Sequence, residues 1–340
     1  MASSNLSSSE IKSFKEISYQ LGKDPSLVQA AGGNTSIKSE NSMLIKASGT
    51  WLINSVDKDI FVELDLHSIN KKISQEQDDS FLDDIISTNN LRPSLETSFH
   101  ALINFKYVLH VHSTAIIANA ILDNSIEEIK KHITDDFVCV PYYRPGFRLT
   151  MGIKKLIQPD TRIFILENHG LIVAGNELED TYHLLLKIHN QLNHIRNGKI
   201  ITATSSTILS ITDYSQKIDE KYSLFKSGDE QLFSLFSKSL YPDHVIFLGP
   251  GIPTFLNNED ANKFIINLKN NDLPLPPYLI IKEQGLFENN SAIPAAREMI
   301  DCFLEVLLRV DLSQSFKFLS EDQESELLNW DVEKYRQSIN

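Results

Sequence analysis

Three histidines are spaced so that they could bind one metal ion. His110 and His112 lie two residues apart in the apolar stretch "YVLHVHSTA", and because side chains alternate along a β-strand, both imidazoles would point to the same face. His169, in "LENHGL", lies at a turn between two apolar runs, where a third imidazole could leave one coordination position open for substrate, as in catalytic zinc sites. The alternative is that all three are hydrogen-bonded core and turn residues, and spacing alone favours neither interpretation.

One carboxylate is placed to act beside such a metal. Glu96 begins an expected helix that runs directly into the strand of His110, so a reversal of the chain can bring it to the metal as a general acid or base. The structural alternative is that an acidic residue in a first helical turn only interacts with the helix dipole. Glu96 therefore indicates a catalytic role only in combination with the three histidines. The remaining histidines, mostly on expected helices or loops, are interpreted as structural.

Small polar residues cluster in three short segments, "AAGGNTSIK", "ASGTW" and "RPSLE". Each places Gly, Ser, Thr or Asn at the end of a strand or the start of a helix, where hydroxyls and free N–H groups can hold a phosphate. Each segment alone is equally typical of a turn. Their occurrence together with a metal constellation favours a phosphate site.

A mixed α/β scaffold is expected to position these residues. Strands and helices alternate up to about residue 200, where a Ser/Thr-rich stretch leads to a second block. Expected elements include a helix over 78–89 and a strand over 106–113, then in the second block a helix over 217–240, a strand over 244–249 and a helix over 291–310. The stretches "IFILENHGLIV" and "LIIKEQGLFEN" resemble each other, a weak indication of an internal repeat whose second copy lacks the histidine.

The composition argues against several classes of partner. A net charge of −13 without a long run of Lys and Arg argues against nucleic acid. No stretch approaches about 18 consecutive apolar residues, and the N-terminus lacks a signal-peptide core, so we expect a cytoplasmic protein without a membrane partner. Cys139 and Cys302 form no C-x-x-C pair, which fits a reducing compartment. Any zinc ion would therefore be bound by histidines and not by cysteines. No G-x-G-x-x-G follows a strand, so we expect no NAD.

In this order, the segments "GGNTS", "IKASGTW", "PSLETSFH", "HVHS" and "ENHGLIVAG" resemble the class II aldolase/adducin family over about residues 8–200. The resemblance implies a three-layer α/β/α domain with a central, mostly antiparallel sheet over residues 1–205, followed by a smaller C-terminal α/β block over residues 206–340. It also implies the roles of individual residues. Zinc or another divalent metal would be bound by His110, His112 and His169, with Glu96 as the catalytic carboxylate, and the substrate phosphate would be held by Asn34, Ser48, Gly49 and Ser94.

The second block resembles the aldolase part of the bifunctional rhamnulose-1-phosphate aldolase/alcohol dehydrogenase proteins, chiefly in "LYPDHVIFLGPG", "AAREMIDC" and "ELLNWDVEKYRQ". This resemblance implies a zinc-dependent aldolase that cleaves a phosphorylated ketose, such as rhamnulose 1-phosphate, to dihydroxyacetone phosphate and an aldehyde. Tyr142 or Tyr143 would serve the aldehyde oxygen. In this family the site lies between the subunits of a homo-oligomer, a cyclic tetramer.

Other functions stay open at this point. A sugar-phosphate epimerase or dehydratase would use the same metal and phosphate sites with a different proton donor. A non-catalytic, adducin-like binding protein would need neither the histidines nor Glu96, and their presence argues against it. A separate dehydrogenase is a candidate partner, because the dehydrogenase half of the bifunctional proteins has no counterpart in this sequence.

Overall fold

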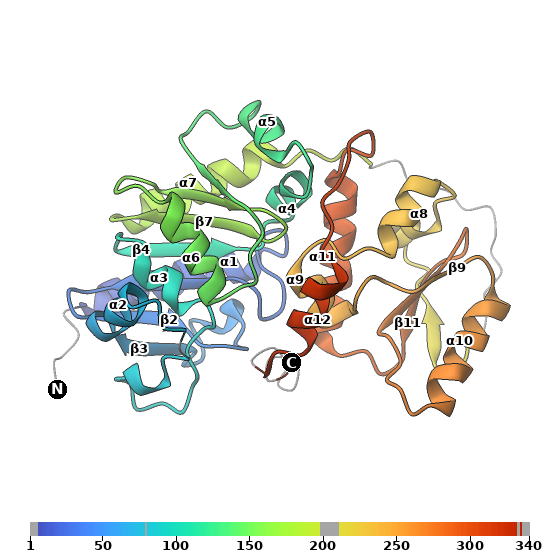
Figure 1. The fold of residues 1–340 in the computed structure, drawn as a ribbon, viewed down its shortest axis with the longest axis horizontal. Coiled ribbons are helices and arrows are strands. Elements are labelled where there is room, and N and C mark those ends of the chain that lie inside the picture. Colours follow the sequence, from blue (N-terminus) through green and yellow to red (C-terminus); the bar gives the residue numbers. More distant parts are fainter. Residues whose placement is uncertain (1–5, 79, 198–210, 332–333, 335–340) are drawn as a thin grey trace.

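The computed structural model describes residues 6–78, 80–197, 211–331 and 334, and it contains two β-sheets, each covered by helices (Figure 1). The N-terminal unit, residues 6–197, is built on seven strands in the order β3-β2-β1-β4-β7-β6-β5. Every neighbouring pair is antiparallel except β5 and β6, which confirms the expected, mostly antiparallel sheet. The strands are β1 (Asn34–Lys38), β2 (Ser42–Lys46), β3 (Phe61–Asp65), β4 (Tyr107–Val111), β5 (Val138–Val140), β6 (Ile163–Leu166) and β7 (Gly170–Gly175).

Helices cover both faces of this sheet, so the three expected layers are present. One face of β4, with Leu109 and Val111, packs against α1 (Ser8–Lys23), α4 (Thr114–Ala120) and α7 (Leu178–Leu192). The other face of the sheet packs against α2 (Leu66–Ser74), α3 (Thr97–Leu102) and α6 (Phe147–Leu156). Because side chains alternate along a strand, His110 lies on this second face, where its ring meets the edge of Phe99 from α3.

The prediction of a helix over 78–89 is wrong. Among the described residues of this range, only a short 3-10 helix, η2 (Leu82–Asp84), is present. Asp84 accepts hydrogen bonds from Ser68 and Lys72 of α2, and Ile85 forms a β-bridge with Leu64 of β3. Contacts with α2 and β3 therefore hold the backbone around residues 84 and 85 in a non-helical conformation, although the local sequence favoured a helix.

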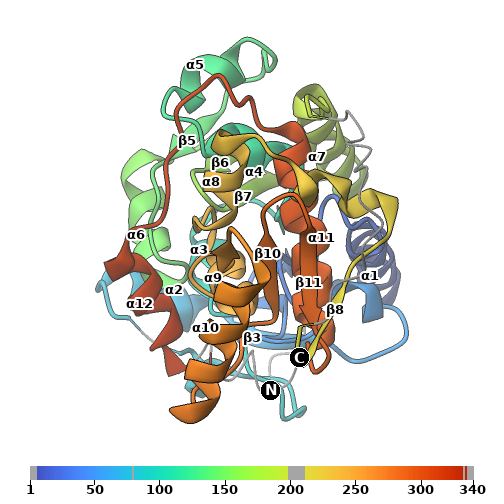
Figure 2. The same ribbon diagram turned by 90° about the vertical axis from the view of Figure 1, so that its right-hand side faces the viewer.

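The C-terminal unit, residues 211–331, holds a second sheet with the strand order β8-β11-β10-β9. Figure 2 views the molecule from this side, with α10 (Asn258–Asn270) over the outer face of the sheet. Helices α9 (Pro242–Leu248) and α11 (Pro294–Arg309) lie on the inner face, and α11 packs against α4 of the N-terminal unit in one continuous apolar core. The other elements are α5 (Ser125–Lys130), η1 (Leu52–Asn54), β8 (Tyr214–Gln216), η3 (Glu220–Lys226), α8 (Glu230–Phe236), β9 (Thr254–Phe255), β10 (Tyr278–Ile281), β11 (Gly285–Asn289) and α12 (Glu321–Leu328).

Two expectations for the C-terminal unit are wrong. The single helix expected over 217–240 is divided into η3 and α8, and Asp229 caps the second of these. The strand expected over 244–249 is the helix α9, which begins at Pro242 and is followed by Gly249. All seven side chains of α9 are buried, and an apolar run that is buried on all sides has no periodicity that separates helix from strand. The long helix expected over 291–310 is present as α11.

The weak internal repeat is present in the structure. Strands β4, β7, β6 and β5 have the same order and directions as β8, β11, β10 and β9. Both central hairpins close through three residues, with Leu166 opposite Gly170 in one and Ile281 opposite Gly285 in the other. In this correspondence Gln216 takes the place of His110.

The expected boundary between residues 205 and 206 lies outside the described residues and stays a prediction. Within the described ranges, no helix combines the length and the apolar character needed to cross a lipid bilayer.

Candidate active site

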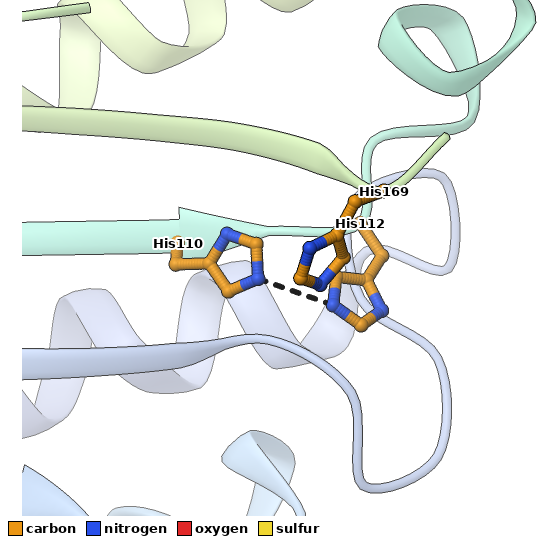
Figure 3. Close-up of side chains that lie close together, drawn as sticks. All are labelled: His110, His112 and His169. Atoms are coloured by element: carbon orange, nitrogen blue, oxygen red, sulfur yellow. Dashed lines mark hydrogen bonds between the residues drawn. The ribbon is translucent and has the colours of Figure 1, made fainter. Parts of the chain in front are cut away.

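The three histidines meet at one end of the seven-stranded sheet (Figure 3). His110 and His112 come from the end of β4, and His169 comes from the turn between β6 and β7. Because β4 pairs with β7, this turn lies beside the end of β4. Gly170 permits the close approach, since a Cβ atom there would lie 2.4 Å from the carbonyl oxygen of Val111. One ring nitrogen from each buried histidine lies within 4.8 Å of the other two.

The hydrogen bonds of these rings fit a divalent cation. A carbonyl oxygen only accepts, so the 3.0 Å contact of His110 Nδ1 with Leu171 assigns the proton to Nδ1. His112 Nδ1 lies 3.1 Å from Oδ2 of Asp243, a close contact between the ring and the carboxylate. Nε2 of His110 and Nε2 of His112 are 3.2 Å apart and share a hydrogen bond (Figure 3). A cation bound to both rings would take the place of this hydrogen bond, and burial holds the pKa of His110 well below its usual range, in the neutral form that binds metal.

Glu96 lies beside the same three rings. It is the residue before the first turn of α3, and its carboxylate oxygens are 3.5 Å from His110 Nε2 and 3.6 Å from His169 Nε2. The side chain is buried. The structure thus brings together Glu96 and the three histidines from three separate segments of the chain, as the sequence predicted.

A buried relay of hydrogen bonds orients Glu96. Asn34 Nδ2 donates to Glu96 Oε2 at 2.8 Å, and the amide oxygen of Asn34 then accepts from His100 Nε2. On the far side of this ring, Ser36 Oγ lies 2.7 Å from Nδ1, which accepts. Burial holds the pKa of His100 well below its usual range. Sequence reasoning treated His100 as structural and missed this link, although its spacing of four residues from Glu96 places it one helical turn away.

A hollow opens beside the histidines, and all four residues expected to hold phosphate line it: Asn34, Ser48, Gly49 and Ser94. Lys46 also lines it, a buried cation that sequence reasoning missed although it precedes "ASG" directly. Its ammonium donates to the carbonyl oxygens of Ala31 and Thr50 at 3.0 and 2.6 Å. A positive charge beside hydroxyl and amide groups suits an anionic substrate.

Neither tyrosine lies at this hollow. Tyr142 packs against Val245 and Leu319, and Tyr143 packs in the core below α6, against Gly152. Pro145, from the same segment, is among the lining residues, and among the described residues that line the hollow there is no tyrosine. A catalytic role for Tyr142 or Tyr143 stays a prediction.

The C-terminal unit contributes Pro242 and Asp243 to the wall of the hollow. Sequence reasoning missed both residues because it placed a strand immediately after them. The signal that could have found them is proline followed by an acidic residue, which is typical of a first helical turn.

Three comparisons bear on this arrangement. The family model described as "Class II Aldolase and Adducin N-terminal domain" matches residues 16–193. A Bacillus subtilis (strain 168) protein named "Uncharacterized oxidoreductase YuxG" is 30% identical over 209 residues, covering 56% of this chain and 30% of that protein. The 3-oxo-tetronate 4-phosphate decarboxylase of Pectobacterium atrosepticum is 36% identical over 101 residues, covering 26% of this chain and 46% of that protein.

The solved N-terminal class II aldolase domain of a conserved Thermoplasma acidophilum protein is 24% identical, with a TM-score of 0.50 over 56% of this chain and 95% of that chain. This likeness shows the fold alone. The aligned part of the chain spans less than half the length of the two curated relatives.

Proposed function

Because the chain belongs to the class II aldolase and adducin family, we propose that it is a zinc-dependent lyase that cleaves a phosphorylated ketose to dihydroxyacetone phosphate and an aldehyde. Rhamnulose 1-phosphate is the first ketose to test. The observation that carries the proposal is the position of Glu96, whose buried carboxylate faces His110 and His169 beside a hollow lined by Lys46. The proposed assembly is a homo-oligomer, which light scattering of the purified protein would test.

Each group has a separate task in this proposal. A divalent metal held by His110, His112 and His169 would supply a Lewis acid that stabilises the negative charge left when the carbon–carbon bond breaks. Glu96 would donate a proton to the carbon that loses the aldehyde, and remove it again in the reverse direction. The phosphate would be held by Lys46 together with the four residues expected from the sequence: Asn34, Ser48, Gly49 and Ser94.

A second candidate reaction is decarboxylation of a 3-oxo sugar-acid phosphate, which the similarity to the Pectobacterium atrosepticum decarboxylase favours. Loss of carbon dioxide from 3-oxo-tetronate 4-phosphate leaves the same three-carbon anion that aldol cleavage leaves. Protonation of this anion gives dihydroxyacetone phosphate in both reactions. The two candidates therefore share one half-reaction and differ only in the group that departs.

That shared half-reaction is the experiment to perform first. Dihydroxyacetone phosphate is incubated with the zinc-loaded protein in deuterium oxide, and exchange of the hydroxymethyl hydrogen is followed by proton NMR. We expect exchange with the native protein and its loss in His112→Ala, together with the loss of bound zinc. His183→Ala is the matched control, because His183 is exposed on α7.

The departing group is then identified with two substrates. Release of dihydroxyacetone phosphate from rhamnulose 1-phosphate supports the aldolase, and release from 3-oxo-tetronate 4-phosphate supports the decarboxylase. Bound zinc without exchange would overturn both reactions and favour an epimerase or a dehydratase. No bound zinc after reconstitution would favour a non-catalytic binding protein.

A further inference from the structure

We propose that Asp243, a residue of the C-terminal unit, is a positioning residue of the metal centre. Its carboxylate lies beside Nδ1 of His112, where it would accept the proton of this nitrogen once Nε2 binds the metal. The inference rests on the proposed function, because it assumes that the three histidines bind a metal. It goes further by assigning part of the centre to residues outside the matched family domain, which ends at residue 193.

The contact between Asp243 and His112 is built into a confined space. Asp243 Oδ2 lies 3.1 Å from His112 Nδ1, and both side chains are buried. A Cβ atom at Gly32 would lie 2.7 Å from the ring nitrogen and 2.9 Å from the carboxylate oxygen, so only glycine leaves room for this pair. Metal-binding histidines usually donate their second N–H to a carboxylate or a carbonyl, which fixes the tautomer and the ring orientation.

The Nδ1 atoms of His110 and His112 contact different kinds of oxygen. His110 Nδ1 contacts the carbonyl of Leu171, a residue of the same sheet. His112 Nδ1 contacts a carboxylate that lies 131 positions later in the sequence, on α9. A charged acceptor is stronger than a neutral one, so Asp243 can hold the ring of His112 more firmly than a carbonyl would.

Independent contacts of the C-terminal unit hold the third histidine. Asn168, which directly precedes His169, donates from Nδ2 to the carbonyl oxygens of Leu240 and Lys317, both at 2.9 Å. The ammonium of Lys317 donates to Glu167 in the same turn at 2.6 Å. The segment that leads into α9 is therefore tied to the turn that carries His169, which fixes Asp243 relative to both ligands.

The helix that carries Asp243 is held firmly. All seven residues of α9 are buried, and its last three side chains, Ile246 to Leu248, belong to a core that includes α11 and Ile117 of α4. The carboxylate therefore has little freedom to move away from His112, as a positioning group requires.

Metal affinity of the metal-free protein tests the inference without any activity assay. Zinc dissociation constants are measured by competition with a chromogenic chelator for the native protein, Asp243→Ala and Asp243→Asn. We expect binding about 10- to 100-fold weaker in Asp243→Ala, the range for loss of such a partner. Asp243→Asn keeps a neutral oxygen acceptor, so we expect a smaller loss. Asp84→Ala is the control, because Asp84 is an equally buried aspartate paired with Lys72 of α2.

The cobalt-substituted proteins give a second readout. Reorientation of His112 changes the visible absorption bands of bound Co²⁺, so we expect a changed spectrum in Asp243→Ala and a native spectrum in Asp84→Ala. Native affinity and a native cobalt spectrum in both Asp243 variants would overturn the inference while leaving the proposed function intact. If the native protein bound neither ion, the proposed function itself would fail, and this inference with it. If Asp243→Ala does not fold, the isosteric Asp243→Asn variant decides by the same two measurements.

Discussion

The amide of Asn34 donates a 2.8 Å hydrogen bond to the carboxylate of Glu96 from the position directly opposite His110 in the β1–β4 pair. The register of two strands therefore fixes the acid–base group relative to a metal ligand. Glu96 lies at a helix terminus, where side chains have more freedom than in a strand, and this bond removes that freedom.

Replacing Glu96 separates proton transfer from metal binding. In Glu96→Gln we expect deuterium exchange into dihydroxyacetone phosphate to slow by about 10²- to 10⁴-fold, the usual contribution of a general acid or base. Zinc content should stay near the native value because the three histidines are unchanged. Glu128→Gln is the control, since Glu128 is a buried glutamate on α5 that does not line the hollow. Equal exchange rates in both variants would exclude Glu96 as the acid–base group.

The relay behind Glu96 predicts an effect for a residue that touches no substrate. In His100→Ala the amide of Asn34 loses its partner, so we expect exchange to slow by about 10-fold at unchanged zinc content. We also expect the free energy of unfolding to fall by about 1 to 3 kcal/mol, because a buried acceptor is left unsatisfied. Ser98→Ala, on the same helix, loses a buried hydrogen bond to Thr150 and serves as the comparison. A slower exchange in Ser98→Ala as large as in His100→Ala would show a general effect of α3.

Lys46 is expected to act on substrate binding. Lys46→Met removes a buried positive charge from the wall of the hollow, so the KM for dihydroxyacetone phosphate should rise by about 10-fold or more, while exchange at saturation changes less. Inhibition by inorganic phosphate should weaken in parallel. Lys72→Met provides a control at a partly buried lysine that pairs with Asp84. An unchanged KM would remove Lys46 from the phosphate site.

Asn168 links the two units through its side chain and adopts a left-handed backbone with φ of +52°. Asn168→Gly keeps this backbone and loses two hydrogen bonds, so the free energy of unfolding should fall by about 2 kcal/mol. Asn168→Ala should lose about 1 kcal/mol more, since alanine disfavours positive φ. Urea unfolding of the metal-free proteins measures both values. An equal loss in the two variants would contradict a left-handed residue at this position.

A buried histidine outside the site predicts a dependence of stability on pH. Burial lowers the pKa of His244 from 6.5 to about 3, and neither ring nitrogen has a hydrogen-bond partner among the described residues. Below pH 6.5 the unfolded chain therefore binds a proton that the folded chain does not. The free energy of unfolding should fall by about 1 kcal/mol per pH unit from this residue as the pH decreases towards 3.

The variant His244→Phe isolates this contribution. Phenylalanine keeps a ring between Tyr241 and Phe303, which His244 contacts edge-on. Urea unfolding of the metal-free proteins at pH 7 and pH 5 should show a shallower pH dependence in the variant. Identical slopes would mean that His244 is protonated in the folded protein.

The parts of the site that could be predicted from the sequence are those that short segments define. His110 and His112 share a face because of their spacing, and the turn at His169 follows from an apolar run broken by "ENHG". Glu96 could be placed because its helix leads directly into β4. Each of these inferences depends on neighbours in the sequence or on the pairing of adjacent strands.

The parts that could not be predicted depend on contacts between distant segments. Asp243 reaches His112 only because α9 is a helix, and its buried apolar run gave no periodic pattern. His100, on α3, gains its role from Asn34, a residue of strand β1. The segment 78–89 lost its expected helix to pairing with β3. Contacts of this kind cannot be predicted from the composition or from the spacing of residues within one segment.

The two matching sets of four strands differ in the residues at two corresponding positions. Gln216 occupies the position that corresponds to His110, and Gln284 the position that corresponds to His169. The second set of strands therefore has the same turn without the two histidines. Gln216 of β8 donates a hydrogen bond to the backbone carbonyl of Gln284, in the turn between β10 and β11. Helix α9 lies between β8 and β9 of the second set and places Asp243 beside His112 of the first. The same arrangement of four strands therefore presents candidate metal ligands in one unit, and in the other it accompanies a residue that contacts one of them.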